Sequence, residues 1–249
     1  MVNSIIKPIF ARFWALWGMV TFTITFLLLY PFFLFSFLIS NKLKSQTYFI
    51  SLSRYWMNVW LPLIGCRLTI NGKHHFKKGQ NYIVVFNHNT LLDIPLSSPF
   101  LPGANKTIAK KSFEAIPFFG LFYKKGSVLV DRKDSKSRTK SYEEMKAVIA
   151  EHMHMCIYPE GTRNRSGELL KPFYDGAFKL ASETGKAVIP CIIMGTKKAM
   201  PIEKTFYLLP QKLSLTFLPP IEPAGLAVQE LKEKAYSTML YALKKQTDN

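Results

Sequence analysis

The chain has 249 residues, enough for one domain with a sizeable core and one additional segment. Its three cysteines (Cys66, Cys156 and Cys191) stand far apart, which excludes a small disulfide-stabilised fold and a cysteine-based metal site. The formal net charge of +17 favours an anionic partner, and beside an apolar segment this favours a membrane surface over nucleic acid.

The N-terminal segment is apolar over a length that suits a membrane. No charged residue occurs between Phe13 and Asn41, a stretch longer than the roughly 20 residues that cross a hydrocarbon core. Because Pro31 lies inside it, we expect the helix to kink or to end near Tyr30. Basic residues flank both sides, so a membrane span and a hairpin or in-plane anchor both stay open.

Residues 46–65 are rich in aromatic side chains, with Arg54 and several polar residues between them. This composition suits an interfacial helix that packs on the first segment, and equally a soluble amphipathic helix that covers the domain. We expect residues 1–65 to form a membrane-associated helical segment and residues 66–249 to form a separate domain.

From Cys66 onward, short apolar runs alternate with segments of helical periodicity. This alternation predicts an α/β domain with a central mixed sheet flanked by helices. An internal proline, Pro190, places the fifth predicted strand at an edge of the sheet or makes it irregular. The predicted strands are Arg67–Ile70, Tyr82–Phe86, Val128–Val130, Met155–Tyr158, Ala187–Met194 and Leu213–Phe217, and the predicted helices are Ser135–His152, Asp175–Thr184 and Gln229–Lys245.

A histidine and a carboxylate follow the second predicted strand. His88 stands in the turn after that strand, where open α/β sheets bind ligands. Asp93 precedes Ile94-Pro95 and is expected at a helix start, facing back toward the turn. A carboxylate there can orient one imidazole nitrogen and leave the other as a base. The alternative is a helix cap with a surface histidine.

A second polar turn follows the apolar run 155–158. Gly161 permits a close approach of a ligand to the backbone, and Arg163 is suited to bidentate phosphate binding. The alternative is a surface ion pair between Glu160 and Arg163. Two histidine pairs, at 74–75 and at 152 and 154, lack further ligands at metal-site spacing, so no metal site is expected.

Taken in order, four segments resemble the motifs of the glycerolipid acyltransferase family, in particular its lysophosphatidic acid acyltransferases. The resemblance covers roughly residues 66–220. The motifs are Asn-His-x-x-x-x-Asp (Asn87, His88, Asp93), a segment from lysine to Asp-Arg (Lys110, Pro117, Phe118, Gly120, Gly126, Asp131, Arg132), (Phe/Tyr)-Pro-Glu-Gly-Thr-Arg (Tyr158 to Arg163), and an apolar strand around a proline (Val188–Ile192).

The resemblance assigns roles to individual residues. It implies that His88 is the general base, oriented by Asp93, and that no covalent acyl-enzyme forms. The implied phosphate-binding and acceptor-binding residues are Lys110, Arg132, Glu160, Gly161, Thr162 and Arg163.

The implied reaction moves a fatty acyl group from acyl-CoA or acyl-carrier protein to the sn-2 hydroxyl of 1-acyl-sn-glycerol-3-phosphate (lysophosphatidic acid). The product is phosphatidic acid, a phospholipid precursor. The thioester is a co-substrate, and no cofactor, metal or nucleic-acid partner is expected. The implied enzyme is bound to membrane lipids, in a bacterial inner membrane or its equivalent, with its site facing the cytoplasm. Another lysolipid acceptor and a non-enzymatic basic membrane adaptor remain alternatives.

Overall fold

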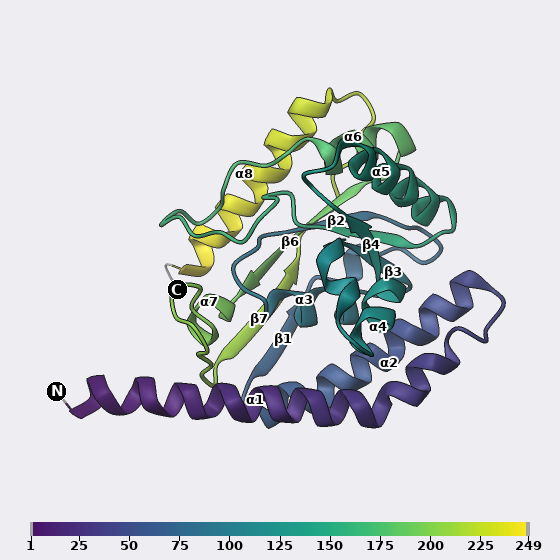
Figure 1. The fold of residues 1–249 in the computed structure, drawn as a ribbon. Helices are drawn as coiled ribbons and strands as arrows, with labels where there is room; N and C mark the ends of the chain where they lie inside the picture. Colours follow the sequence, from purple (N-terminus) through teal and green to yellow (C-terminus); the bar gives the residue numbers. More distant parts are fainter. Residues whose placement is uncertain (1, 248–249) are drawn as a thin grey trace.

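A computed structural model describes residues 2–247 as a seven-stranded sheet between two layers of helices (Figure 1). The helices are α1 (Val2–Phe35), α2 (Lys42–Leu63), α3 (Asp93–Ser97), α4 (Phe119–Gly126), α5 (Ser135–Ala150), α6 (Gly176–Thr184), α7 (Thr196–Ala199) and α8 (Val228–Thr247). The strands are β1 (Arg67–Asn71), β2 (Ile83–Phe86), β3 (Asn105–Lys110), β4 (Ser127–Val130), β5 (His154–Ile157), β6 (Val188–Met194) and β7 (Lys212–Phe217).

The sheet has the strand order β1-β7-β6-β2-β5-β3-β4, and only the β6–β7 pair is antiparallel. The predicted mixed sheet flanked by helices is therefore confirmed. The sheet has a hydrophobic core on each of its two faces. Alternate side chains of β2 pack into one core or the other, because successive residues of a strand point to opposite faces. Ile83 and Val85 pack with α5, α6 and α8, whereas Val84 and Phe86 pack with α1, α2 and α3.

The sequence prediction missed β3, because its sequence NKTIAK holds only two adjacent apolar residues, Ile108 and Ala109, and so gives no apolar run. The strand nevertheless lies inside the sheet, between β5 and β4. The prediction of an edge position for the Pro190 strand was wrong, since β6 lies between β2 and β7. The alternative, an irregular strand, agrees with the antiparallel pairing: Val188 to Cys191 spans three positions, whereas the opposite stretch from Phe217 to Ile221 spans four, which leaves a break in the ladder at Pro190. Pro190 is tolerated because its missing N–H falls at the break in the antiparallel ladder, while its carbonyl still accepts from the N–H of Leu218 at 2.8 Å.

The predicted end of the helix near Tyr30 was wrong, since α1 continues through Pro31 to Phe35. The alternative, a kink at Pro31, stays a prediction. Tertiary packing holds this last turn: the Phe33 ring lies 5.4 Å from the Phe49 ring and 4.8 Å from the Phe122 ring, measured between centroids. Such contacts compensate for the hydrogen bond that a proline removes from a helix.

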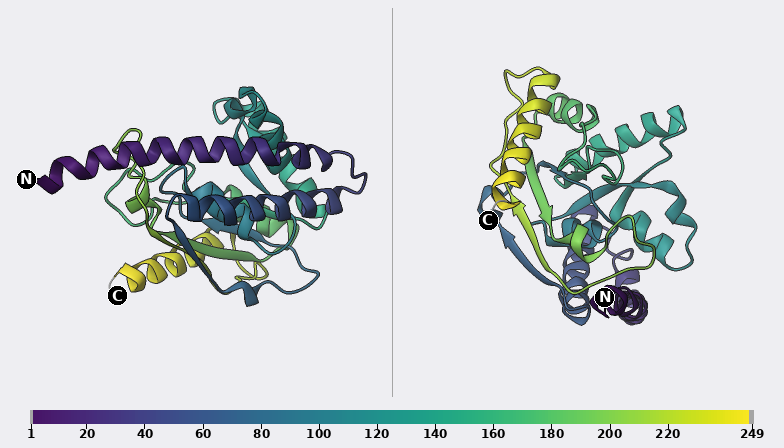
Figure 2. Two further views of the ribbon diagram at one scale, coloured as in Figure 1. Left: turned by 90° about the horizontal axis from the view of Figure 1, so that it is seen from below. Right: turned by 90° about the vertical axis from the view of Figure 1, so that its left-hand side faces the viewer.

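Helices α1 and α2 run side by side beneath the sheet (Figure 2). Two hydrogen bonds from indole N–H groups connect the helices. Trp14 and Trp17 of α1 donate to the backbone carbonyls of Ile64 and Leu63, at 2.9 and 2.8 Å. Helix α2 also packs on β1 and β3, so it contacts both the first helix and the domain. The expected boundary after residue 65 falls in the turn that follows α2, and it stays a prediction.

His154 at the start of β5 is buried with both ring nitrogens bound to the backbone. Its Nδ1 accepts the N–H of Tyr82 at 3.1 Å, and the ring also bonds the Pro102 carbonyl. Among the described residues, no group of three or more histidine, cysteine or carboxylate side chains converges on a metal-sized site.

The stability of the protein is expected to fall as the pH is lowered from about 6.5 to 4. Burial lowers the pKa of His154 to about 4, so the unfolded chain takes up a proton in this range and the folded chain does not. The expected loss is roughly 3 kcal/mol of unfolding free energy. Urea titrations of the wild type and of His154→Gln would measure it. Parallel pH profiles for the two proteins would contradict the assignment.

Candidate active site

The carboxylate of Asp93 binds the turn that carries His88. Its Oδ2 accepts hydrogen bonds from His88 Nδ1 at 2.9 Å and from the backbone N–H groups of Asn89 and Thr90 at 2.6 and 2.7 Å. Asp93 is fully buried at the first residue of α3. The side chain thus faces back toward the turn, and it fixes the imidazole with Nδ1 inward.

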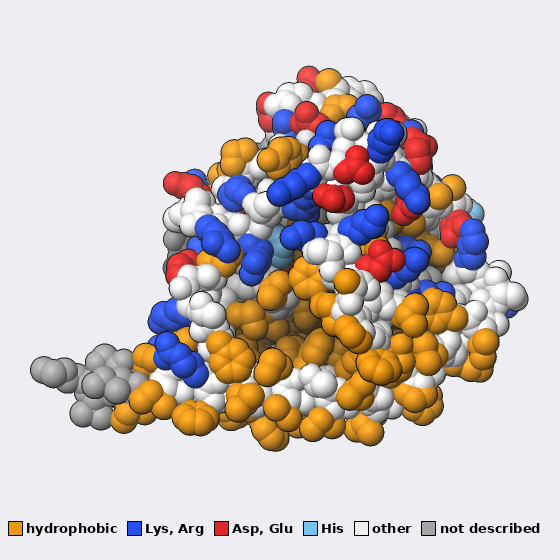
Figure 3. Space-filling view, viewed as in Figure 1, with side chains coloured by type: hydrophobic (Ala, Val, Ile, Leu, Met, Phe, Trp, Pro, Cys, Tyr) orange, Lys and Arg blue, Asp and Glu red, His pale blue; other side chains and the backbone are white. Residues whose placement is uncertain are grey.

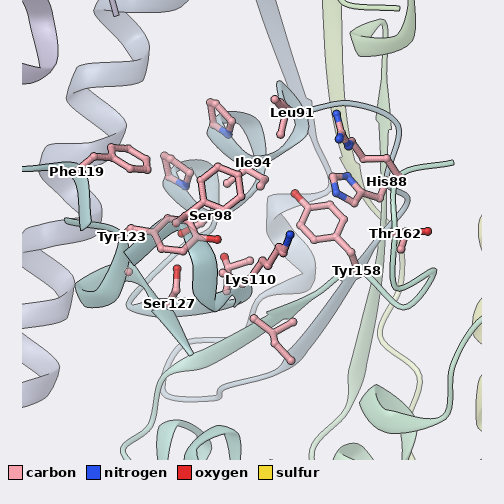
Figure 4. Close-up of a pocket in the computed structure, with 18 of the residues that line it drawn as sticks. His88, Leu91, Ile94, Ser98, Lys110, Phe119, Tyr123, Ser127, Tyr158 and Thr162 are labelled. Atoms are coloured by element: carbon pink, nitrogen blue, oxygen red, sulfur yellow. The ribbon is translucent and has the colours of Figure 1, made fainter. Parts of the chain in front are cut away.

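The other imidazole nitrogen, Nε2, is left for the cavity that His88 lines. The His88 side chain keeps 14% of its surface exposed, whereas that of Asp93 keeps none. The ring of Tyr158 packs on the imidazole at a centroid distance of 4.3 Å, and its hydroxyl donates to Ser97 Oγ at 2.8 Å. Figure 4 shows the two rings side by side on one wall.

Glu160 joins the two polar turns through backbone hydrogen bonds. Its two carboxylate oxygens accept from the N–H of His88 at 2.7 Å and the N–H of Lys171 at 3.0 Å. Burial raises the pKa of Glu160, although both N–H donors favour its charged form. The surface ion pair with Arg163 is therefore not formed, since Glu160 holds the backbone of the His88 turn instead.

Gly161 adopts a left-handed conformation, with φ at +72°. A Cβ atom there would lie 2.6 Å from the Tyr174 ring, so only glycine fits this turn. Neither Glu160 nor Gly161 lines the cavity. The structure thus places these two predicted binding residues behind the site, where they shape the loop that carries Thr162 and Arg163.

One cavity of about 1300 Å³ joins a basic part to an apolar part. Of the predicted residues, His88, Lys110, Arg132, Thr162 and Arg163 line it. Lys133 and Lys171 also line the cavity, and the sequence prediction missed them because neither belongs to a motif. Lys171 Nζ donates a hydrogen bond to Thr162 Oγ1 at 2.6 Å. The apolar part is formed by α1, α2 and α4 through Phe22, Phe49, Trp56, Met57, Phe119 and Phe122.

The surface around this cavity is divided by chemistry. Figure 3 shows hydrophobic side chains along α1 and around the hollow, with lysine and arginine gathered above it. A ligand that fills the cavity would therefore combine an anionic group with a long apolar chain. His88 lies in the lining between these two parts.

Comparison with known proteins agrees with this geometry. The family model described as Acyltransferase matches residues 67–194, which include the His88 turn, the Arg163 turn and six of the seven strands. The chain belongs to the acyltransferase family.

Relatives of this acyltransferase carry a more specific name. The human 1-acyl-sn-glycerol-3-phosphate acyltransferase alpha is 31% identical over 72% of this chain and 64% of its own length. The Escherichia coli (strain K12) 1-acyl-sn-glycerol-3-phosphate acyltransferase is 29% identical over 70% of each chain. This chain thus spans just under two thirds of the human relative.

The fold of this acyltransferase has a solved counterpart. The crystal structure of the 1-acyl-sn-glycerophosphate (LPA) acyltransferase PlsC from Thermotoga maritima has a TM-score of 0.83 and 23% sequence identity. The match covers 97% of this chain and 98% of the other, so the shared fold includes the two N-terminal helices.

Replacing Tyr158 by leucine is expected to lower kcat roughly three- to tenfold, because loss of the ring removes an aromatic contact worth about 1 kcal/mol from the imidazole. Tyr158→Phe keeps the ring and should retain most activity. Burial keeps the pKa of Tyr158 well above its usual value, so the hydroxyl stays neutral in the wild type. Steady-state kinetics across pH would test this; equal losses in both variants would show that ring packing is not the cause.

Proposed function

We propose that this acyltransferase transfers a fatty acyl group from a thioester to the sn-2 hydroxyl of 1-acyl-sn-glycerol-3-phosphate, forming phosphatidic acid. The observation that carries the proposal is the His88–Asp93 pair on a cavity with one basic and one apolar part. The names of the human and bacterial relatives support the same acceptor.

In the proposed mechanism, His88 Nε2 takes the proton of the acceptor hydroxyl as its oxygen attacks the thioester carbonyl. The new C–O bond forms, the C–S bond breaks, and the leaving sulfur receives the proton from the imidazolium. Asp93 holds the imidazole in the required tautomer and stabilises the cation that forms between these steps. The geometry requires no covalent acyl-enzyme.

We assign Lys110, Arg132 and Arg163 to the phosphate of the acceptor. They line the basic part of the cavity, and the two guanidinium groups suit bidentate contact with phosphate. Thr162 lines the same wall, bonded to Lys171. The apolar part suits an acyl chain, delivered on coenzyme A or on acyl-carrier protein as co-substrate, and the proposal needs no further cofactor.

The apolar helix α1 fits membrane association, because residues 6–35 are long and apolar enough to cross a bilayer by length and composition. We propose that α1 lies in the membrane plane, since it is attached to α2 and the domain from Ala11 to Phe33. A bacterial inner membrane or its equivalent, with the site on the cytoplasmic side, is the proposed location.

The proposed function is tested by thiol release from purified protein, with acyl-CoA or acyl-carrier protein and a panel of lysolipid acceptors. Turnover that is fastest with lysophosphatidic acid supports it. Faster turnover with a lyso-aminolipid or another lysophospholipid would show that the proposed acceptor is wrong, whereas the proposed acyl transfer would stand. Salt-sensitive lipid binding without thioester consumption would indicate a membrane adaptor instead.

Replacing Arg163 by alanine is expected to raise KM for lysophosphatidic acid about tenfold at nearly constant kcat, because it removes a ground-state phosphate contact. The matched control is Arg67→Ala, since Arg67 is exposed on β1 and does not line the cavity. Initial rates at varied acceptor concentration measure both constants. An unchanged KM with a lower kcat would show that Arg163 does not bind the phosphate of the acceptor in the ground state.

A further inference from the structure

A compact lobe beside the cavity exposes large apolar side chains. It consists of residues 111–126: the 3-10 helix η3 (Lys111–Ala115), a short turn and α4. Ile116, Phe118 and Leu121 are 44%, 63% and 51% exposed. This density of exposed apolar residues in six positions is unusual for a surface that contacts only water.

The lobe is amphipathic, and its inner side is fixed to α1. The Phe119 and Phe122 rings lie 5.8 and 5.5 Å from the Phe26 ring. The mostly exposed Phe118 ring touches α1 only at its edge, 5.7 Å from the Tyr30 ring. The exposed face of α1 continues beside these contacts with Phe32, which is 56% exposed. The apolar surfaces of the lobe and of α1 are therefore continuous (Figure 3).

The backbone holds Phe118 outward at a cost. Its φ of +60° is rare for a residue with a side chain, and strain of this kind costs about 1–3 kcal/mol. Gly120 permits the turn, since a Cβ there would overlap the carbonyl oxygen of Glu114. A strained turn that exposes an aromatic ring indicates a partner that covers the ring.

We propose, resting on the proposed membrane attachment of α1, that this lobe is a second membrane contact, which enters the interfacial layer of an anionic bilayer beside α1. The continuity with α1 identifies a bilayer as the occupant. Exposed Lys111 places a cation on the lobe, as anionic headgroups require, and exposed Lys124 adds a second one, which also pairs with Glu114 at 3.3 Å. Leu91 and Phe113 line the cavity and are partly exposed, so they form an apolar part of its rim. With the lobe in the bilayer, this rim would open toward lipid between α1 and the lobe.

A fluorescent label tests this contact without catalysis. Leu121→Cys is labelled with an environment-sensitive dye; the native cysteines are buried and do not compete. The control is labelled Tyr241→Cys on α8, which is 71% exposed and lies on the other side of the sheet (Figure 1). On phosphatidylcholine–phosphatidylglycerol vesicles, we expect a blue shift and a gain in emission at position 121 only. No change at 121, or equal changes at both positions, would overturn the proposal.

Binding measurements add a second test. The double variant Ile116→Ser/Leu121→Ser is expected to partition about tenfold more weakly into the same vesicles, with Tyr241→Ser as control. Neither replaced side chain lines the cavity, so thiol release with a short-chain, water-soluble lysolipid should be unchanged. Wild-type partitioning by the double variant would contradict the proposal. So would a label response at 121 that rises with protein concentration in the absence of vesicles, because a second copy would then cover the lobe.

Discussion

The variant His88→Ala is expected to release thiol about 10²–10⁴-fold more slowly than the wild type, because it lacks the proposed general base. The protein should remain folded. The backbone N–H of His88 still donates to Glu160, and its carbonyl still accepts from Asn164, so neither loop connection depends on the imidazole.

The control for this variant is His74→Ala, because His74 is exposed and does not line the cavity. Thiol release by purified proteins, with thermal melting of each, separates lost chemistry from lost structure. Near-normal turnover in a folded His88→Ala protein would contradict the proposed mechanism.

The variant Asp93→Asn is expected to lower kcat by about 10³-fold or more, since it disturbs the tautomer and the orientation of the base. The wild-type oxygen Oδ2 accepts three hydrogen bonds, from His88 Nδ1 and from the N–H groups of Asn89 and Thr90. An amide oxygen can face the two backbone donors, but it cannot stabilise an imidazolium as a carboxylate does. A buried position makes the loss larger, because water does not replace the missing charge.

Asp175→Asn is a suitable control, because Asp175 is largely exposed and pairs with Lys232 at 2.7 Å outside the cavity. Single-turnover rates measured across pH would show the effect on the chemical step. If Asp93→Asn kept wild-type rates at neutral pH, the carboxylate would be a structural anchor of the turn alone.

Local sequence contains enough information to predict the His88–Asp93 contact. A strand end, a five-residue spacing and a proline at the helix start bring the two side chains together, and the structure places them at hydrogen-bond distance. The bond from Glu160 to the backbone of His88 could not be predicted, because it joins residues 72 positions apart. Lys171 was missed for a different reason: it lies only nine positions from Thr162, but outside the motif, and the folded loop is what brings the two side chains together.

At each proline one of the two predicted outcomes was wrong, because tertiary contacts decide where helix α1 ends and where strand β6 lies in the sheet. Helix α1 continues past Pro31 because aromatic side chains of α2 and α4 pack on its last turn. Strand β6 accepts Pro190 inside the sheet because its antiparallel pairing is broken there, between the Val188–Ile221 bridge and the Cys191–Phe217 pair. In both cases the local propensity was assessed correctly, and neighbours that the sequence does not reveal compensated for it.

The helix that fits membrane association also forms a wall of the cavity, since Phe22 of α1 lines it together with Phe49 and Trp56 of α2. Removing the first helix to obtain a soluble domain would therefore take away part of the cavity wall and expose the aromatic side chains of α2. If the proposed function holds, attachment to the bilayer and retention of the acyl chain both depend on the same 34-residue element. Substitutions on its outer face would then affect membrane binding, and substitutions on its inner face would affect the shape of the cavity.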